Sequence, residues 1–225
     1  MTIASALLKL PALIVLAAAA SQAPVAVVED VSGNPGGLQM MDYVVPGQVI
    51  HLGPADSMVL SYLSSCVQET ITGGAVTVGT DHSDIVGGDV QRKTIRCEGG
   101  KTELTRSLAD KSGAMALREI PQGYRQEIVP QVTLYGRSPV VEVNPVGALV
   151  IERLDQPGER HDVILGDAQL VQGRFLDLST ADVVLAPGGV YMARVGMQQI
   201  VFKVDHDARA GKTPIAGRLL QLQPH

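Results

Sequence analysis

Short hydrophobic runs separated by glycine- and proline-rich turns dominate the chain from about residue 25 onward. In the first half, β-branched and apolar residues gather at residues 25–28, 44–52, 58–63, 67–71, 75–78 and 90–95. Turn-forming residues stand between these runs, including the Gly53-Pro54-Ala55-Asp56 cluster and the glycine pairs at residues 73–74 and 87–88. Short strands with this punctuation are typical of all-β sandwiches and barrels.

A second series of strand-like runs begins after residue 128. It comprises residues 129–134, 140–143, 148–153, 163–165, 183–185, 190–195, 200–204 and 219–222. A helical composition is found at residues 104–118, and we expect a second short helix near residues 166–175. The pattern therefore predicts an all-β protein with at most one or two short helices. In this prediction, a connector at residues 107–128 joins a glycine-rich β module, residues 24–106, to a second β sandwich, residues 129–225.

The N-terminus has the pattern of a secretory signal peptide. Residues 7–20 are apolar except for Lys9, and the small residues Ser21 and Ala23 follow. A charged start, a short apolar core and small residues at the end are the features of such a signal, and the apolar run is shorter than the roughly 20 residues that a membrane span needs. We predict a signal peptide at residues 1–23, a periplasmic or secreted protein, and no membrane span after signal removal.

The two cysteines, Cys66 and Cys97, are the only ones in the chain. In an oxidising compartment, one disulfide is the simplest interpretation of two cysteines. A bridge over a loop of this length would stabilise the fold by roughly 3.5–4 kcal/mol. The alternative, a pair of thiolate metal ligands, lacks the close C-x-x-C spacing and a partnering pair of histidines. We therefore predict a Cys66–Cys97 disulfide.

Charge is distributed unevenly along the chain. Residues 24–91 contain eight acidic residues and no lysine or arginine, whereas residues 92–125 contain eight basic and four acidic residues. This asymmetry indicates domain pairing, a charged partner or an ordinary solvated surface. Nucleic-acid binding is disfavoured, because the net charge is −5 and the chain has no tryptophan and few other aromatic residues.

One cluster of polar residues is a candidate site, namely Asp81, His82 and Asp84 with Asp89 nearby. Its carboxylates could ligate calcium, but the spacing of a calcium-binding hand is absent. Aspartate and serine are also favoured in turns between strands, where their side chains bond to the local backbone. We expect a turn that presents an acidic binding surface, with no bound metal.

No catalytic motif is present in the sequence. There is no G-x-S-x-G string, no H-E-x-x-H pair and no phosphate-binding G-x-x-x-x-G-K-[ST] loop. A glycosidase with paired carboxylates is disfavoured by the near absence of aromatic residues that could stack on sugars. We expect a protein that is not an enzyme and that needs no cofactor.

The stretch "YVVPGQVIHLGPADSMVLSYLSSCVQETITGGAVTVG", residues 43–79, resembles a FecR-like periplasmic domain. Residues 46–53 take the place of that family's turn and strand, and residues 58–62 that of its next strand. The resemblance covers roughly residues 25–104 and implies a glycine-rich periplasmic β module. Regulators of this family cross the inner membrane, whereas no span is predicted here after the signal, so their signalling role is not implied.

The stretch "LAPGGVYMARVGMQQIVFKVD", residues 185–205, resembles the closing strands of an immunoglobulin-like sandwich. Fold alone does not fix function. The leading hypothesis is an exported, non-catalytic β-domain protein that acts as a binding or scaffold module for a periplasmic or envelope protein. The alternative is a small-ligand or glycan-binding module, which a pocket between the two domains would favour, and a cryptic hydrolase ranks third.

Overall fold

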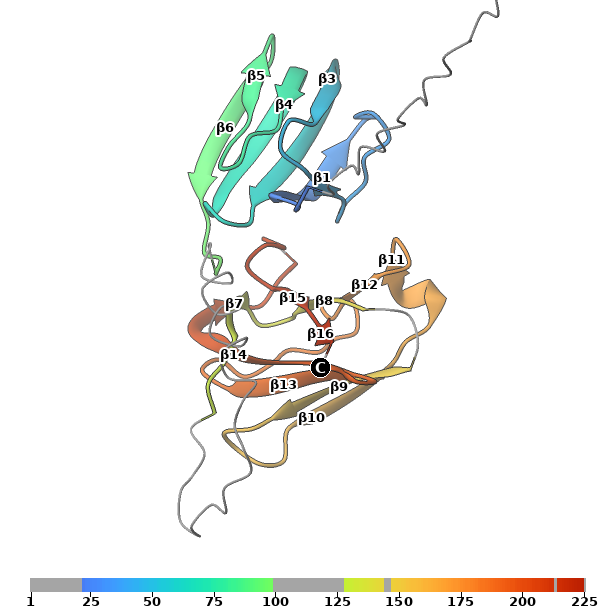
Figure 1. Ribbon diagram of the computed structural model, residues 1–225, viewed down its shortest axis with the longest axis vertical. Coiled ribbons are helices and arrows are strands. Elements are labelled where there is room, and N and C mark those ends of the chain that lie inside the picture. Colours follow the sequence, from blue (N-terminus) through green and yellow to red (C-terminus); the bar gives the residue numbers. More distant parts are fainter. Residues whose placement is uncertain (1–21, 99–127, 144–146, 213, 225) are drawn as a thin grey trace, which may run out of the picture.

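The computed structural model describes residues 22–98, 128–143, 147–212 and 214–224. Within these ranges, every regular element except one 3₁₀ turn is a β-strand, which confirms the predicted all-β fold class. The strands form two modules, one above the other in Figure 1. Residues 1–21 of the predicted signal peptide and the helix predicted at residues 104–118 lie outside the described residues.

Strands β1 to β6 form the first module, an antiparallel sheet that covers one hydrophobic core. The order of the sheet is β2-β1-β3-β4, and β5 and β6 pair with different halves of β4. Its core contains Leu60, Tyr62 and Ile71, none of which is exposed to solvent. The strands are β1 (Ala26–Ser32), β2 (Tyr43–Val44), β3 (Val49–Tyr62), β4 (Val67–Thr77), β5 (Asp84–Val86) and β6 (Asp89–Thr94).

The glycine clusters of this module bend its strands, whereas the sequence predicted turns between separate strands. In β4, Gly73 and Gly74 have φ angles of +66° and +83°, and the strand continues on both sides of them. Residues 53–56 form a bulge in β3 beside this point, and Gly87 and Gly88 separate β5 from β6 there. Because glycine tolerates positive φ, the backbone can bend here without ending the sheet.

The second module is a sandwich of two sheets, as predicted. One sheet has the order β10-β9-β13-β14-β16, with β7 parallel to β14, and the other has the order β11-β12-β8-β15. Ile151, Tyr191 and Phe202 of the first sheet pack with Val141 and Leu176 of the second. The strands are β7 (Val132–Gly136), β8 (Val140–Glu142), β9 (Ala148–Arg153), β10 (Arg160–Ile164), β11 (Leu170–Val171), β12 (Phe175–Asp177), β13 (Val190–Val195), β14 (Gln198–Arg209), β15 (Leu219–Gln221) and β16 (Gln223–Pro224).

Two local predictions in the second module were wrong. Residues 183–185 form a loop, which contributes apolar side chains to the core without pairing as a strand. The helix expected near residues 166–175 is limited to one 3₁₀ turn, η1 (Asp167–Gln169). The positive φ angles of Gln172 and Gly173, +53° and +66°, turn the chain between β11 and β12, and a helix cannot continue through such a reversal.

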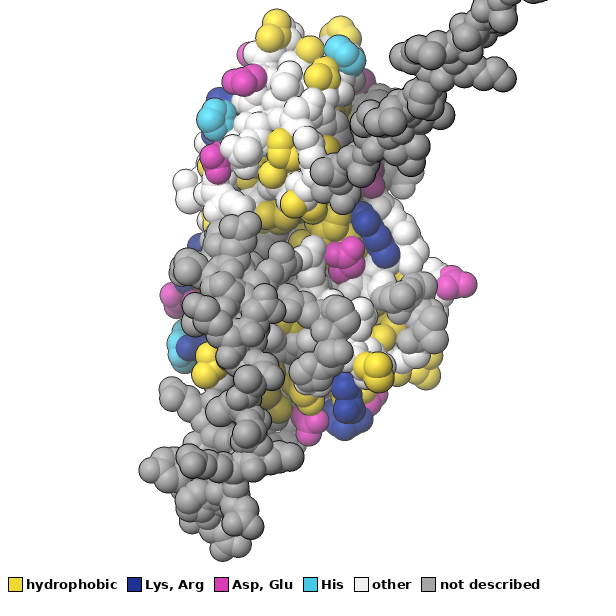
Figure 2. Space-filling model, viewed as in Figure 1, with side chains coloured by type: hydrophobic (Ala, Val, Ile, Leu, Met, Phe, Trp, Pro, Cys, Tyr) yellow, Lys and Arg dark blue, Asp and Glu magenta, His cyan; other side chains and the backbone are white. Residues whose placement is uncertain are grey.

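A third apolar cluster joins the two modules. Val27 of β1 and Met41 pack against Val140 of β8, Phe175 of β12 and Ile215, and all five side chains are buried. Figure 2 shows hydrophobic side chains (yellow) at this boundary. Side chains alternate along a strand, so each of β1 and β8 sends neighbouring residues to its own core and to the junction. The modules are therefore packed against each other.

Candidate functional site

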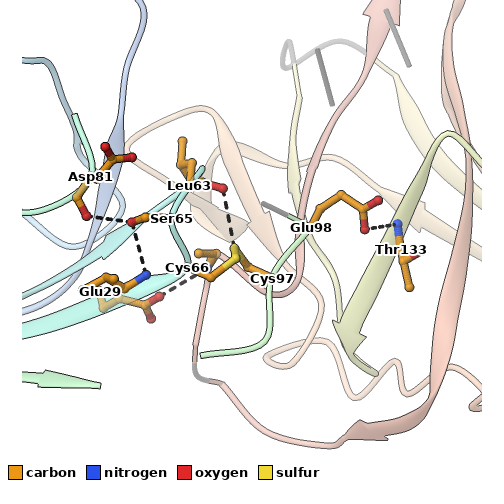
Figure 3. Close-up of a disulfide and its surroundings, with 10 residues drawn as sticks. Glu29, Leu63, Ser65, Cys66, Asp81, Cys97, Glu98 and Thr133 are labelled. Atoms are coloured by element: carbon orange, nitrogen blue, oxygen red, sulfur yellow. Dashed lines mark hydrogen bonds between the residues drawn. A yellow bond between two sulfur atoms is a disulfide. The ribbon is translucent and has the colours of Figure 1, made fainter. Parts of the chain in front are cut away.

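The predicted Cys66–Cys97 disulfide is present and lies close to the junction between the modules. It joins the turn between β3 and β4 to the chain that follows β6, with the two Cα atoms 5.6 Å apart. The Ile95 backbone N–H donates a hydrogen bond to the Cys66 carbonyl at 2.8 Å. Figure 3 shows the bridge, and beyond it Glu98 accepts a hydrogen bond from the Thr133 backbone N–H of β7 at 2.9 Å. The disulfide thus fixes the segment that leaves the first module.

The predicted acidic surface lies on the outer edge of the first sheet. Asp81 and His82 stand in the turn before β5, Asp84 begins β5, Asp89 begins β6, and all four residues are exposed. Within the described ranges, no three histidine, cysteine or acidic side chains come together as a metal site would require. In Figure 2 the acidic side chains (magenta) on the visible face of this module stand singly.

Interactions with the buried residue Ser83 hold the turn that carries Asp81 and His82. The Ser83 backbone N–H donates to both carboxylate oxygens of Glu69 at 3.1 Å, and its hydroxyl shares a hydrogen bond with the Tyr62 hydroxyl at 2.7 Å. Arg92 pairs with the same Glu69 carboxylate at 2.7 Å and donates to the Ser83 carbonyl. These contacts give the segment the architecture of a hydrogen-bonded turn.

Two of the eight acidic residues of the base-free segment are buried, so the acidic field of this module is weaker than the sequence indicates. Glu69 is fully buried and paired with Arg92, and Glu29 is 3% exposed at the module junction. A sequence signal for burial exists for Glu29, which follows the apolar residues 25–28, but not for Glu69, whose neighbours Gln68 and Thr70 are polar. A single sequence does not otherwise distinguish these two carboxylates from the exposed ones.

A second polar cluster, in the second module, connects the β9–β10 hairpin to β13. The Tyr191 hydroxyl donates to Glu159 at 2.9 Å, and Arg153 binds both Glu159 and Asp155. Burial raises the pKa of Tyr191 to about 12, and the Glu159 carboxylate adds to that effect. The Nε2 atom of His161 lies 3.6 Å from Oε1 of Glu159. All these contacts tie strands together, which is the role that we assign to them.

A cleft of about 760 Å³ lies where the two modules meet. The first module supplies one wall from the end of β6, and the second supplies the opposite wall from β7, from the end of β14 and from the loop before β15. The residues around the cleft are Lys93, Thr94, Ile95, Arg96, Tyr135, Gly136, Asp207, Arg209, Pro214 and Gly217. The sequence analysis singled out none of these residues as a site.

Arg96 crosses from the first module to the second within this cleft. Its Nη2 donates to Asp205 at 2.9 Å, and its Nη1 lies 3.7 Å from Asp207. The guanidinium stacks over the Tyr135 ring, 4.8 Å from the ring centroid. Gly217 allows this approach, because a Cβ atom there would lie 2.5 Å from the Arg96 carbonyl oxygen. The side chain of Arg96 is therefore held in place by ion pairs and by an aromatic ring.

The loop before β15, which contributes Pro214 and Gly217 to the cleft, is held from both sides. From the first module, Glu29 accepts hydrogen bonds from the Ile215 and Ala216 backbone N–H groups at 2.7 and 3.2 Å. From the second module, the buried Arg218 guanidinium donates to Asp177 at 2.7 and 2.9 Å, and to the Lys212 carbonyl at 2.7 Å. The described residues of this loop are therefore anchored to both modules.

Lys93 and Arg209 are the remaining basic residues of the cleft. Among the described residues, neither has a carboxylate within ion-pair distance, and both side chains are exposed. Lys93 comes from the first module and Arg209 from the second. The sequence indicated the position of Lys93 only, since the base-free segment ends at residue 91 and the basic zone begins immediately afterwards.

Searches of protein-family models, of curated proteins and of solved structures each found no match to this chain. The FecR-like and immunoglobulin-like resemblances therefore stay predictions. In the described part of the chain, no helix has the length and apolarity to cross a membrane.

Proposed function

We propose that this chain is an exported, non-catalytic binding protein that takes a small ligand into the cleft between its two modules. The cleft carries the proposal, because its volume of about 760 Å³ falls within the range of ligand-binding pockets, which often form where domains meet. A cleft between the domains was the feature that, on sequence grounds, would favour a small ligand over a protein partner. The disulfide supports the exported location, since such bridges persist in oxidising compartments.

The arrangement of the walls also supports this function. Binding is stronger when the site is formed before the ligand arrives, since less conformational entropy is then lost. Arg96, the loop before β15 and the segment fixed by the disulfide are each held by contacts within the protein. The proposed site is therefore pre-organised on both sides.

Filling the cleft with a side chain tests this function. Thr94 lines the cleft and is exposed, so a Thr94→Trp substitution fills space there and removes no charge. The full chain should be screened by thermal shift against a panel of sugars, amino acids, organic acids and phosphate esters. We expect compounds that raise the unfolding midpoint of the wild type and leave that of T94W unchanged. A Gln91→Trp variant, on the exposed part of β6 outside the cleft, is the matched control and should respond like the wild type.

Two results would count against the function. One is a panel in which no compound stabilises the wild-type protein. The other is a set of compounds that stabilise T94W as much as the wild type, since these would bind elsewhere.

The acidic edge of the first sheet favours a second candidate, binding of a protein partner. Among the described strands, β5 and β6 have a neighbour on one side only, and Asp84 and Asp89 are exposed on them. An extended basic segment can add to such an edge as a further strand. Replacing Asp81, Asp84 and Asp89 together with asparagine should then slow association with that partner and weaken its salt dependence. An association rate that ignores both salt and the substitutions would exclude this candidate.

A further inference from the structure

The charged side chains that line the cleft differ in whether they have an ion-pair partner. Arg96 pairs with Asp207, which also lines the cleft, and with Asp205, which does not, whereas Lys93 and Arg209 together carry +2 and have no ion-pair partner among the described residues. These two cations come from different modules, so an anion that they share would contact both walls. Because ion pairs are weak in full solvent and stronger in a concave, partly desolvated site, the cleft is where these charges can contribute to binding.

Asp207, two residues before Arg209 on β14, adds a different preference beside the cations. Its side chain is 85% exposed, and its only ion-pair partner among the described residues is Arg96, at 3.7 Å. That distance leaves carboxylate lone pairs available for hydrogen-bond donors. A second anionic group near Asp207 would be repelled, whereas hydroxyl groups would be accepted.

We propose that the ligand of this cleft is a small acidic sugar, whose single anionic group binds between Lys93 and Arg209 and whose hydroxyl groups donate to Asp207. This inference rests on the proposed function and specifies its ligand class. The anion is a carboxylate, as in a uronic acid, or a phosphate, as in a sugar phosphate, because both cations recognise either group. The cleft volume of about 760 Å³ has room for more than one sugar ring.

The rigid parts of the cleft are consistent with this ligand. Arg96 and Tyr135 form a stacked pair, so the aromatic ring is already covered on one face by the guanidinium. Ile95, Pro214 and Gly217 supply apolar and backbone surface against which the ring carbons of a sugar can pack. Recognition is thus assigned to the charges of Lys93 and Arg209 and to hydroxyl acceptance by the neighbouring Asp207, with no requirement for a large aromatic platform.

The test compares charged sugars with a neutral one on the full-length mature protein. Binding of glucuronate, glucose 6-phosphate, glucose and inorganic phosphate is measured by isothermal titration calorimetry at low salt. We expect glucuronate or glucose 6-phosphate to bind, and glucose and inorganic phosphate to bind at least about tenfold more weakly. Comparison of the two charged sugars shows whether the site prefers a carboxylate or a phosphate.

Variants then assign the charged groups. Lys93→Gln and Arg209→Gln should each weaken binding of the charged sugar about tenfold, as expected for loss of one charge-assisted contact, and leave the weak binding of glucose unchanged. Arg194→Gln removes an exposed arginine of β13 outside the cleft and is the matched control. Asp207→Asn should weaken binding of the charged sugar less than either change at a cation, because an amide oxygen still accepts a hydrogen bond.

Each contrary result has a distinct meaning. If glucose binds as tightly as the charged sugars, or if K93Q and R209Q bind them like the wild type, the acidic-sugar inference is wrong. The proposed function survives in that case, provided that T94W abolishes binding. If inorganic phosphate binds as tightly as the sugar phosphate, the site holds an adventitious ion only and the sugar assignment is wrong. If none of these probes binds to the wild type, the assignment also fails, and the wider thermal-shift panel decides whether the proposed function fails with it.

Discussion

Glu29 connects the two modules through a carboxylate that is 3% exposed. The residue sits where the pairing of β1 with β3 shifts register between Val28 and Asp30, so it is the extra residue of a β-bulge. Bulges re-aim side chains, and this one places the carboxylate against the backbone N–H groups of Ile215 and Ala216. One irregular residue in the first strand thereby bonds to the loop that contributes Pro214 and Gly217 to the cleft.

The ionisation of Glu29 should make stability depend on pH. Burial raises the pKa of its carboxyl above the ordinary value of 4.5, although hydrogen bonds from Ile215, Ser61 and Ala216 and the charge of Arg218 oppose that change. The folded protein therefore holds the Glu29 proton more tightly than the unfolded chain does. This contribution to stability is fully present below pH 4.5 and is lost as the pH rises through the raised pKa.

A Glu29→Gln variant lacks this titration and isolates its effect. We expect the unfolding free energy of the wild type, minus that of the variant, to fall as the pH increases above 4.5. Urea unfolding of both proteins across a series of pH values measures the difference. Parallel pH profiles for the two proteins would show that Glu29 titrates alike in the folded and unfolded states.

The long strands of the first module extend further than the hydrophobic pattern indicates. In β4 the reason is that the strand bends at Gly73 and Gly74 without ending. In β4, the inward-facing residues are Ile71 before the glycine pair and Val76 after it, so the alternation changes parity across the bend. A single-sequence pattern registers such a change as the end of one strand and the start of another. Residues 67–71 and 75–78 were therefore predicted as two strands, whereas residues 148–153 and 190–195, which have no bend, match β9 and β13.

Gly74 is required for two reasons, because its φ angle is positive and because a side chain has no space there. A Cβ atom on Gly74 would lie 2.6 Å from the Val86 carbonyl oxygen and 2.6 Å from the Gly88 nitrogen, whereas one on Gly87 would meet nothing within 4 Å. Both glycines have positive φ, +83° and +72°. We expect Gly87→Ala to cost about 1–2 kcal/mol for conformation alone. Gly74→Ala should cost about 3 kcal/mol or more, because the steric clash adds to this cost.

Urea unfolding of G74A and G87A provides the measurement, with circular dichroism confirming that each variant retains its sheet. Equal losses of unfolding free energy in the two variants would contradict the prediction. They would mean that the strands separate at little cost and that the close approach of β4 to the β5–β6 edge is not required. A G74A protein too unstable to purify, beside a folded G87A, would agree with the prediction.

At the level of the whole molecule, a third apolar cluster lies between the two modules and contains side chains from both. This contact should hold the modules together after the chain between them is cut. The predicted connector at residues 107–128 lies almost wholly outside the described residues. We expect limited proteolysis to cut within it and the two fragments to co-elute on gel filtration, because Val27, Met41 and Phe175 are buried in the shared cluster.

A charged residue in the junction should separate the fragments. Val27→Glu places a carboxylate at a position with no solvent exposure, and we expect the cleaved variant to elute as two smaller species. Val86→Glu, at a valine of β5 that is 75% exposed, is the control and should co-elute like the wild type. Separate elution of the cleaved wild-type fragments would show that the junction contributes little binding energy.

The proposed site could be predicted only in part from the sequence. The disulfide and the start of the basic zone at Arg92 were visible, and residues 93–96, which lie between Arg92 and Cys97, supply one wall of the cleft. The opposite wall was not visible, because Tyr135, Asp207 and Arg209 come from segments about 70 residues apart that meet only through the parallel pairing of β7 with β14. Pairing of this kind leaves no short-range mark in a sequence.

The contact between Glu29 and Ile215 spans 186 residues of the chain, whereas the disulfide of the first module spans 31. A polypeptide emerges from the ribosome N-terminus first, so every strand of the first module exists long before Ile215 is synthesised. During that interval Val27 and Met41 lack the second-module side chains of the shared cluster, and the Glu29 carboxylate lacks its two backbone donors. The first module thus completes this end of its structure only when the second module folds against it.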